Sequence, residues 1–185
     1  MIMVDMPFGS YQESPENAYR NASQLMEAGA QIVKLEGGKW LAETISFLSD
    51  RGIPTCAHLG LTPQSVHKLG GYKVQGTDAQ NAISIIESAK ILEESGVDIV
   101  VLELIPSELG KKITKHVKIP TIGIGAGIFV DGQVLVLHDM LGLSEGHNPK
   151  FAKSFFNKGD TIEQAIRNYI NAVRNKEYPN SKHSY

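Results

Sequence analysis

The chain has 185 residues, of which 42% are hydrophobic and 21% charged, which is enough for one well-buried globular domain. Its formal net charge of −2 gives no electrostatic reason to expect nucleic acid or an anionic membrane surface as a partner. The single cysteine, Cys56, excludes an internal disulfide and fits a reducing compartment. With no apolar run of bilayer length and no signal-peptide pattern in "MIMVDMPF", we expect a soluble, cytoplasmic protein.

Short apolar runs alternate with helical patterns along the chain. Strands buried on both faces read as Val- and Ile-rich runs without strict polar alternation, and such runs cover residues 2–4, 31–35, 54–59, 98–104, 120–124 and 134–137. Helices are predicted over residues 15–28, 39–51, 79–95, 107–116, 148–157 and 161–175. Ser14 and Asp78 are the expected N-caps of two helices, and Asp160 and Glu163 have capping-box spacing. This alternation predicts an α/β fold with a parallel sheet.

Polar residues mark the carboxyl ends of the predicted strands: Asp5, Lys34 with Glu36, His58, Glu103, and His138 with Asp139. About six strands suit either an open doubly wound sheet or part of a (β/α)8 barrel. In a barrel these ends converge on one mouth, whereas in an open sheet they are spread along an edge. Only about a dozen residues separate Ile124 from Val136, which leaves little room for a crossover helix in either fold.

Each polar residue also has a structural interpretation. Asp5 fits a turn, Lys34 and Glu36 fit an ion pair on one strand face, and His58 fits a hydrogen-bonded core position. Capping of the last strand is the favoured interpretation for His138 and Asp139. Loop or surface positions are expected for His67, His116, His147 and His183.

Glu103 is the strongest catalytic candidate. Its neighbours on the chain are apolar, so its carboxylate would be desolvated, and desolvation makes a carboxylate a better general base. The run "TIGIGAG" (residues 121–127) lacks the full G-x-G-x-x-G fingerprint, so we expect close backbone packing beside a ligand rather than a dinucleotide loop. The long connection over residues 60–76 is typical of a functional lid or of a mobile surface loop.

These residue types together favour metal-assisted enolate chemistry. Asp5 and Glu36 are oxygen ligands suited to Mg2+, which usually keeps further positions for water and substrate. A 2-oxo acid bound there, with Lys34 adding positive charge, has an acidified carbon next to its ketone. Glu103 would remove the proton from that carbon. The residues alone do not name the electrophile.

Six segments carry a resemblance to a known family: "VDMPFGSY", "IVKLEGGKW", "AHLGLTPQSVHKLGGYKVQG", "VLELIP", "IGIGAG" and "DGQVLVLHDMLGL". In order and wording they resemble ketopantoate hydroxymethyltransferases over essentially the whole chain. The resemblance implies a (β/α)8 TIM barrel of the phosphoenolpyruvate-mutase type and Mg2+. It also implies transfer of a hydroxymethyl group from 5,10-methylenetetrahydrofolate to 3-methyl-2-oxobutanoate, giving 2-dehydropantoate in pantothenate biosynthesis, by a homo-oligomer that is a decamer in the family.

The resemblance also implies roles for single residues. Asp5 would be a metal and substrate ligand, Lys34 a substrate contact, Glu36 a metal ligand, Glu103 the catalytic proton acceptor and His58 its catalytic neighbour.

The chain departs from the family pattern at its start. Family members carry a preceding stretch with the first two barrel strands and a "GDS" segment, which supplies another metal-binding Asp and a substrate-binding Ser. We therefore expect residues 1–185 to form a single, partial barrel domain with C-terminal helices from about residue 148. A shortened gene model, a split enzyme with a separate N-terminal segment and a decayed remnant each account for this departure. A non-catalytic fragment and another Mg2+-dependent 2-oxo acid carbon–carbon bond enzyme remain alternative functions.

Overall fold

The computed structural model describes residues 1–144, 146 and 148–185, which contain a parallel sheet of six strands. The strands are β1 (Met3–Asp5), β2 (Ile32–Glu36), β3 (Thr55–Gly60), β4 (Ile99–Glu103), β5 (Thr121–Ile124) and β6 (Gly132–Gln133). The α-helices are α1 (Pro15–Glu27), α2 (Ala42–Ser49), α3 (Val66–Leu69), α4 (Ala79–Glu94), α5 (Ser107–His116), α6 (Leu137–Leu141) and α7 (Ile162–Arg174). Short 3-10 turns cover Lys39–Leu41, Pro63–Ser65 and Ser181–His183.

The strand order separates the two folds that the sequence left open. The strands lie in the order β1-β2-β3-β4-β5-β6, so each pairs with its successor and the order never reverses. A doubly wound sheet reverses at a switch point, whereas a barrel is wound in one direction. The described residues therefore form a half-barrel, and the prediction of an incomplete α/β barrel is confirmed.

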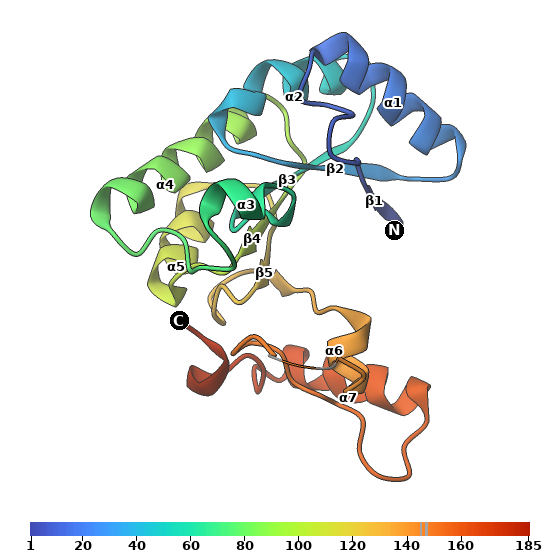
Figure 1. Cartoon of the computed structure of the whole chain (residues 1–185), viewed down its shortest axis with the longest axis vertical. Coiled ribbons are helices and arrows are strands. Elements are labelled where there is room, and N and C mark those ends of the chain that lie inside the picture. The colour runs from blue at the N-terminus through green and yellow to red at the C-terminus, as the bar shows by residue number, and fades with distance from the viewer. Residues whose placement is uncertain (145, 147) are drawn as a thin grey trace.

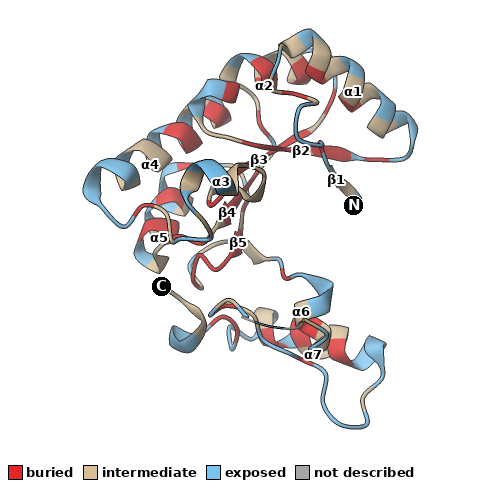
Figure 2. Cartoon of the chain, in the orientation of Figure 1, coloured by how far each residue is buried: buried red, intermediate tan, exposed pale blue. Residues whose placement is uncertain are grey.

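Two apolar cores cover the two faces of the sheet. Figure 1 shows α1, α2, α4 and α5 in an arc on one side, and Figure 2 shows buried residues along the strands and on the sheet-facing sides of these helices. Val33, Ala57 and Leu102 belong to this outer core. Alternate strand residues, such as Ile32, Cys56 and Val101, face the other way and belong to a second core that the C-terminal segment covers. The functional candidates Lys34, His58 and Glu103 follow this second alternation.

Local signals set the helix ends largely as predicted. The side chains of Ser14 and Asp78 accept hydrogen bonds from the backbone N–H groups of Asn17 and Asn81, which confirms both N-caps. The expected capping box of Asp160 and Glu163 is wrong. Thr161 caps α7 instead, by accepting from the N–H of Gln164.

The C-terminal third holds two further corrections. Residues 148–157 do not form a helix, because Phe151 and Phe155 are drawn into the second core and the N–H of Phe155 donates to the carbonyl of Met140. The last strand covers Gly132–Gln133 rather than residues 134–137. His147 lies outside the described residues.

The short connection from β5 to β6 needs no crossover helix. Residues 125–131 form a loop in which the Asp131 carboxylate accepts from both the N–H and the hydroxyl of Thr121. Gly125 and Gly127 have positive φ angles of 65° and 81° and pack closely against Phe151 and Ser107. The glycine run therefore serves close backbone packing, while the ligand expected beside it stays a prediction.

Candidate active site

The carboxyl ends of β1 to β4 bring the predicted site residues into one polar cluster. Strand register places Asp5 beside Lys34 and Glu36 beside His58, while Gly60 pairs with Glu103. Because parallel strands run in the same direction, these ends meet at one edge of the half-barrel. The cluster of Asp5, Lys34, Glu36, His58 and Glu103 is therefore a product of strand register.

Lys34 is the hub of the cluster. Its Nζ atom lies 3.1 Å from Oδ1 of Asp5 and 3.9 Å from Oε1 of Glu36, and 3.2 Å from Nδ1 of His58. The Lys34 side chain is 13% exposed and that of Glu36 only 6%, whereas the Asp5 side chain is 63% exposed. The ion pair of Lys34 with Glu36, one of the two interpretations of the sequence, is present. The cluster is exposed to solvent at Asp5.

His58 connects Lys34 to Glu103. An ammonium group can only donate, so Nδ1 of His58 accepts from Lys34 and the proton of the neutral ring resides on Nε2. Nε2 lies 3.0 Å from Oε2 of Glu103, but the contact is not aligned as a hydrogen bond, and this buried N–H has no aligned acceptor among the described residues. A buried donor left in this state is costly unless a shift of the carboxylate or a ligand satisfies it.

Glu103 closes β4 with its carboxylate at the edge of a cavity. Its side chain is 14% exposed, which confirms that most of it is removed from water. The next residue, Leu104, has a φ of 50°, a strained conformation for a branched side chain, and its N–H and C=O are held by Ile124 and Gln75. Such strain next to a candidate base is typical of functional sites.

Two supporting residues were missed by the sequence interpretation. The hydroxyl of Tyr11 donates to Oε1 of Gln64 at 2.7 Å and accepts from the N–H of Glu36, while the N–H of Gln64 donates to Oε2 of Glu36. Burial raises the pKa of Tyr11 to about 12. Both residues lie inside the quoted segments "VDMPFGSY" and "HLGLTPQSV", so their positions were available, but nothing in the residue pattern tied them to Glu36.

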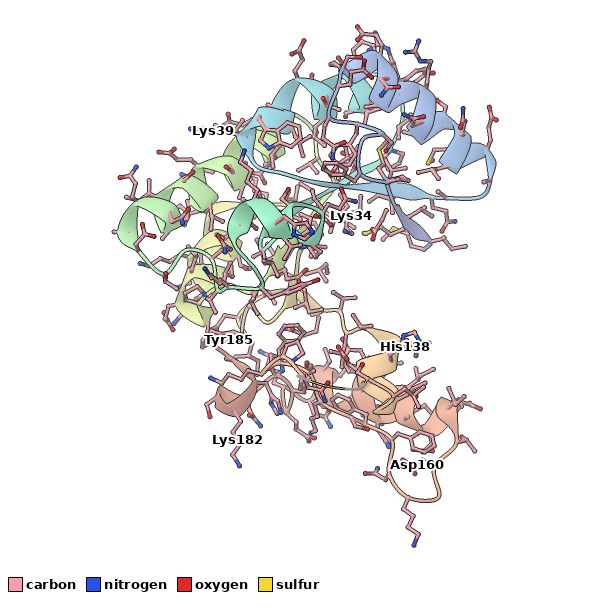
Figure 3. The ribbon with its side chains drawn as sticks, viewed as in Figure 1. Lys34, Lys39, His138, Asp160, Lys182 and Tyr185 are labelled. Carbon is pink, nitrogen blue, oxygen red and sulfur yellow. The ribbon has the colours of Figure 1, made fainter. Side chains whose placement is uncertain are left out.

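His138 and Asp139 do not join the cluster. They lie in α6 rather than at the end of a strand, so the expectation that they cap the last strand is wrong. Figure 3 shows His138 on α6, away from Lys34 on β2. His67 and His116 are exposed and His183 is partly exposed, as expected for residues outside the site, and His138 is exposed as well.

The connection after β3 is folded over the site. Residues 60–76 contain the Pro63–Ser65 turn and α3, and Gln64 within it bonds Glu36. The N–H of Gln75 donates to the carbonyl of Leu104, the residue after Glu103. Hydrogen bonds therefore hold this segment to Glu36, a member of the cluster, and to Leu104, the neighbour of Glu103. Such anchoring is expected of a segment that covers a site.

The donor set of the cluster fits a magnesium ion. The cluster contains three carboxylates, those of Asp5, Glu36 and Glu103, and one ammonium, that of Lys34, so its excess of negative charge favours a cation. Mg2+ is commonly held by only one or two carboxylates, with water and substrate completing its octahedron. Among the described residues no group of three or more acidic, His or Cys side chains is placed to hold a metal ion. Asp5 and Glu36 are thus two ligands at most.

Comparison with known proteins identifies the family. The sequence model of ketopantoate hydroxymethyltransferase matches residues 1–181. The chain belongs to this family. It is 55% identical over 184 residues to the 3-methyl-2-oxobutanoate hydroxymethyltransferase of Nitrosomonas eutropha, covering 100% of this chain and 68% of the relative. The enzyme of the same name from Shewanella sp. strain MR-4 is 53% identical over 185 residues, covering 100% of this chain and 70% of the relative.

The fold has a structural relative outside this family. A protein provisionally described as a phosphonomutase, from Burkholderia cenocepacia J2315, aligns with a TM-score of 0.50 at 17% identity, over 65% of this chain and 54% of that protein. At this identity the likeness concerns the fold alone, and it agrees with the barrel type expected for the family. Within the part of the chain that the structure describes, no helix is both long and apolar enough to cross a bilayer.

Proposed function

We propose that this chain transfers a hydroxymethyl group from 5,10-methylenetetrahydrofolate to 3-methyl-2-oxobutanoate, giving 2-dehydropantoate for pantothenate biosynthesis. Family membership supports the reaction, and the observation that carries the mechanism is the contact of Glu103 with His58 and, through it, with Lys34. This arrangement places a candidate base, a donor and a fixed positive charge around one small space.

Lys34 and Asp5 would bind the oxo acid. The Lys34 ammonium opposes the negative charge of the substrate carboxylate and the charge that develops on its keto oxygen when the neighbouring carbon loses a proton. Asp5 is the most exposed member of the cluster, so a small molecule would reach the cluster at its carboxylate. Asp5 and Glu36 would hold Mg2+, which when bound would supply Lewis acidity to the oxygens of the oxo acid.

Glu103 would take the proton from C3 of 3-methyl-2-oxobutanoate. The largely buried carboxylate is poorly hydrated, which favours its acting as a base. The Nε2 atom of His58 lies 3.0 Å from one of its oxygens, and a small shift of the carboxylate would align a hydrogen bond that orients it, while Lys34 holds the ring. His58 is therefore a positioning residue unless the substrate itself reaches Nε2.

The overall transfer is balanced without an oxidant or reductant. The C3–H bond of the oxo acid breaks, and its electron pair forms the new bond from C3 to the one-carbon unit. The two carbon–nitrogen bonds to the folate break, and a water supplies the oxygen of the new hydroxyl. The hydrogen from C3 and the two from water end on the two folate nitrogens and on that hydroxyl.

Hydrogen exchange at C3 tests this proposal, because it requires the base but no folate. We expect the chain to release tritium from C3-labelled 3-methyl-2-oxobutanoate in the presence of Mg2+. Glu103→Gln should slow the release by about 100-fold to 10,000-fold while leaving oxo acid binding, measured by calorimetry, largely intact. Glu108→Gln, an exposed acid on α5, is the matched control. Undiminished exchange in Glu103→Gln would remove Glu103 from its role, and absence of Mg2+-dependent oxo acid binding by the unaltered chain would favour a non-catalytic fragment.

A further inference from the structure

The two carboxylate oxygens of Glu36 have different partners. Oε2 accepts a hydrogen bond from the backbone N–H of Gln64 at 2.8 Å. Oε1 lies 3.9 Å from Nζ of Lys34 and 3.9 Å from Nδ1 of His58, and it accepts no hydrogen bond from the described residues. Because the Glu36 side chain is only 6% exposed, its packed surroundings keep the two oxygens from exchanging places. Glu36 therefore offers one oxygen, Oε1, to a cation or to a water bound to one.

The side chain of Gln64 fixes the position of its own backbone. Its Nε2 donates to the carbonyl of Met6 at 2.9 Å, and its Oε1 accepts from the hydroxyl of Tyr11 at 2.7 Å. Met6 and Tyr11 are 0% and 1% exposed, so both partners are held within the outer core. Both ends of the Gln64 amide are thus bonded to buried residues, which directs the backbone N–H of Gln64 at Glu36.

The local turn leaves this N–H available for Glu36. Gln64 is the middle residue of the Pro63–Ser65 turn, in which the N–H of Ser65 donates to the carbonyl of Thr62. The first N–H groups of such a turn have no carbonyl of the turn to bond. Pro63 has a fixed φ angle and so restricts the turn to few conformations. The sequence "TPQS" therefore prepares a donor for Glu36 before any ion binds.

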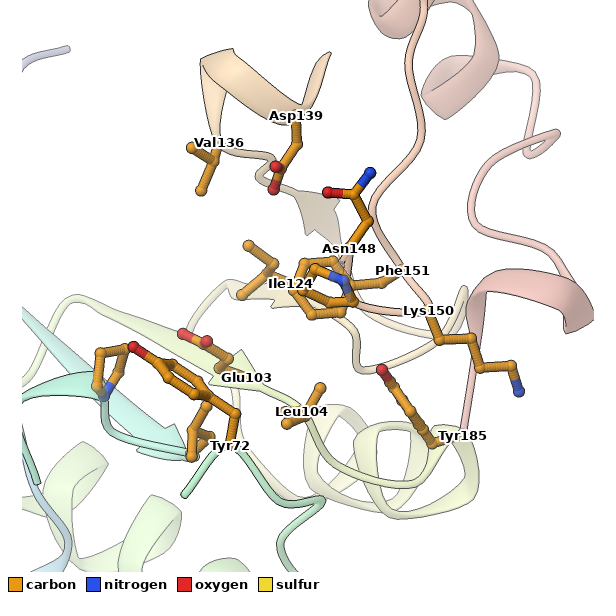
Figure 4. Close-up of a pocket in the computed structure, with 13 residues that line it drawn as sticks. Tyr72, Glu103, Leu104, Ile124, Val136, Asp139, Asn148, Lys150, Phe151 and Tyr185 are labelled. Carbon is orange, nitrogen blue, oxygen red and sulfur yellow. The ribbon is translucent and has the colours of Figure 1, made fainter. Parts of the chain in front are cut away.

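Glu36 and Glu103 border different cavities. Figure 4 shows the larger cavity, of about 790 Å3, which Glu103 and Asp139 help to line. The smaller cavity, of about 270 Å3, is lined by Glu36 and His58. This smaller volume is just below the range of sites for small organic molecules and suits an ion with a few waters. Glu36 does not line the larger cavity, so a molecule bound there does not compete with Gln64 for Oε2.

A carboxylate held in this way discriminates between cations. Mg2+ requires nearly ideal octahedral geometry and is satisfied by single carboxylate oxygens and waters, whereas Ca2+ takes more oxygen ligands and often both oxygens of one carboxylate. To bind Glu36 through both oxygens, a cation has to displace the N–H of Gln64 from Oε2, which leaves that N–H without its acceptor. The arrangement therefore penalises Ca2+ and leaves the binding of Mg2+ unaffected.

We propose that Gln64 is a positioning residue that acts through Glu36 and makes the polar cluster selective for a small divalent cation over Ca2+. The inference rests on the proposed function, in which Asp5 and Glu36 hold the cation, and adds the residue that sets the choice of ion. A purely structural role of the same hydrogen bonds, which hold residues 60–76 in place, would lower stability when removed but would not change the ratio of two ion affinities.

Competition between Mn2+ and Ca2+ measures that ratio in the whole chain. Mn2+, the probe for Mg2+, is titrated by electron paramagnetic resonance with Ca2+ as the competitor. Gln64→Met keeps the length of the side chain but removes its strong donor and acceptor, and should lower the preference for Mn2+ over Ca2+ by about tenfold. Gln75→Met is the matched control, because Gln75 lies in the same segment and its side chain bonds the carbonyl of Lys73 and no residue of the cluster. It should keep the preference of the unaltered chain.

Tyr11→Phe keeps the test valid if Gln64→Met fails to fold. It removes the hydroxyl that bonds Oε1 of Gln64 and leaves the bond from Gln64 to Met6, so it should change the ratio in the same direction by about threefold. Three results would overturn the role of Gln64: an unchanged ratio in both variants, an equal loss of Mn2+ and Ca2+ affinity, or no Mn2+ binding by the unaltered chain.

The outcomes also distinguish this inference from the proposed function. Selectivity that depends on Gln64, in a chain that does not exchange the C3 hydrogen, would support the inference and overturn the proposed function. Mg2+-dependent C3 exchange, together with an ion ratio that Gln64→Met leaves unchanged, would do the reverse.

Discussion

Lys34 fixes the tautomer of His58. The Lys34 Nζ atom lies 3.2 Å from Nδ1 of the ring, and an ammonium has no lone pair to accept with, so the imidazole proton must be on Nε2. Nε2 is the atom that faces Glu103, 3.0 Å away. Because Lys34 occupies Nδ1, His58 presents its Nε2–H group, and not a lone pair, to the carboxylate of Glu103.

This relationship predicts the nitrogen spectrum of His58. Long-range 1H–15N correlation should show the Nε2–H tautomer at neutral pH, with an acceptor-type shift at Nδ1. In Lys34→Met the donor to Nδ1 is gone, and we expect a mixture of the two tautomers. An Nδ1–H ring in the unaltered chain would contradict the assignment and with it the orienting role of His58.

Competition between Lys34 and a metal ion predicts opposite effects of two substitutions. The ammonium neutralises the carboxylates of Asp5 and Glu36, so Lys34→Met should tighten the binding of Mn2+, used as a probe for Mg2+, by about tenfold or more. Asp5→Asn removes a ligand and should weaken it by a similar factor. Electron paramagnetic resonance of free Mn2+ measures both. Unchanged affinity in both variants would place the ion elsewhere.

The polar cluster was predictable from sequence because strand register is simple. Asp5, Lys34, Glu36, His58 and Glu103 each end an apolar run, and in a parallel sheet wound in one direction such ends must be neighbours. The order of residues along the chain therefore predicted which polar side chains would be neighbours, whereas the barrel class came from the family resemblance and is confirmed by the strand order. The hydrogen bonds among them needed coordinates, since a pattern of residues does not say which atom faces which.

The C-terminal segment was harder to predict because tertiary packing overrides its local signals. Residues 148–157 have a helical pattern, yet Phe151 and Phe155 are more favourably buried in the second core from an extended chain. Asp139 was interpreted as a strand cap because residues 134–137 resemble a strand. Its place on the cavity wall follows from α6, which the sequence did not indicate.

Gly60 is predicted to be essential for the position of Glu103. Its φ is 91°, and a methyl group there would overlap the carbonyl oxygen of Glu103, its partner in the sheet register. Gly60→Ala should lower the stability by about 3 kcal/mol or more and remove C3 exchange, because strain and overlap act together. Gly52→Ala is the control, since Gly52 has a φ of 77° but open space around it, and should cost about 1 kcal/mol with exchange retained. Equal losses in both variants, measured by urea unfolding, would contradict the role of the overlap.

Tyr11 makes the stability of the folded chain depend on pH in the alkaline range. Burial raises the pKa of its hydroxyl from 10.0 to about 12. The folded chain therefore keeps a proton that the unfolded chain releases, so the contribution of Tyr11 is complete below pH 10 and declines as the pH rises toward 12. Between these pH values the unfolding free energy of the unaltered chain should fall with pH more steeply than that of Tyr11→Phe. The two slopes should differ by about 1.4 kcal/mol per pH unit.

At neutral pH the same substitution acts through hydrogen bonds. Tyr11→Phe leaves the N–H of Glu36 and the side chain of Gln64 without their shared partner, which should cost about 1 to 3 kcal/mol. Unfolding followed by the fluorescence of Trp40, which stacks on Tyr11 with ring centres 6.5 Å apart, measures both effects. Tyr19→Phe is the control, because it removes a tyrosine hydroxyl that does not bond Glu36. Parallel pH profiles for the unaltered chain and Tyr11→Phe would show that the buried hydroxyl is not what couples the site to alkaline unfolding.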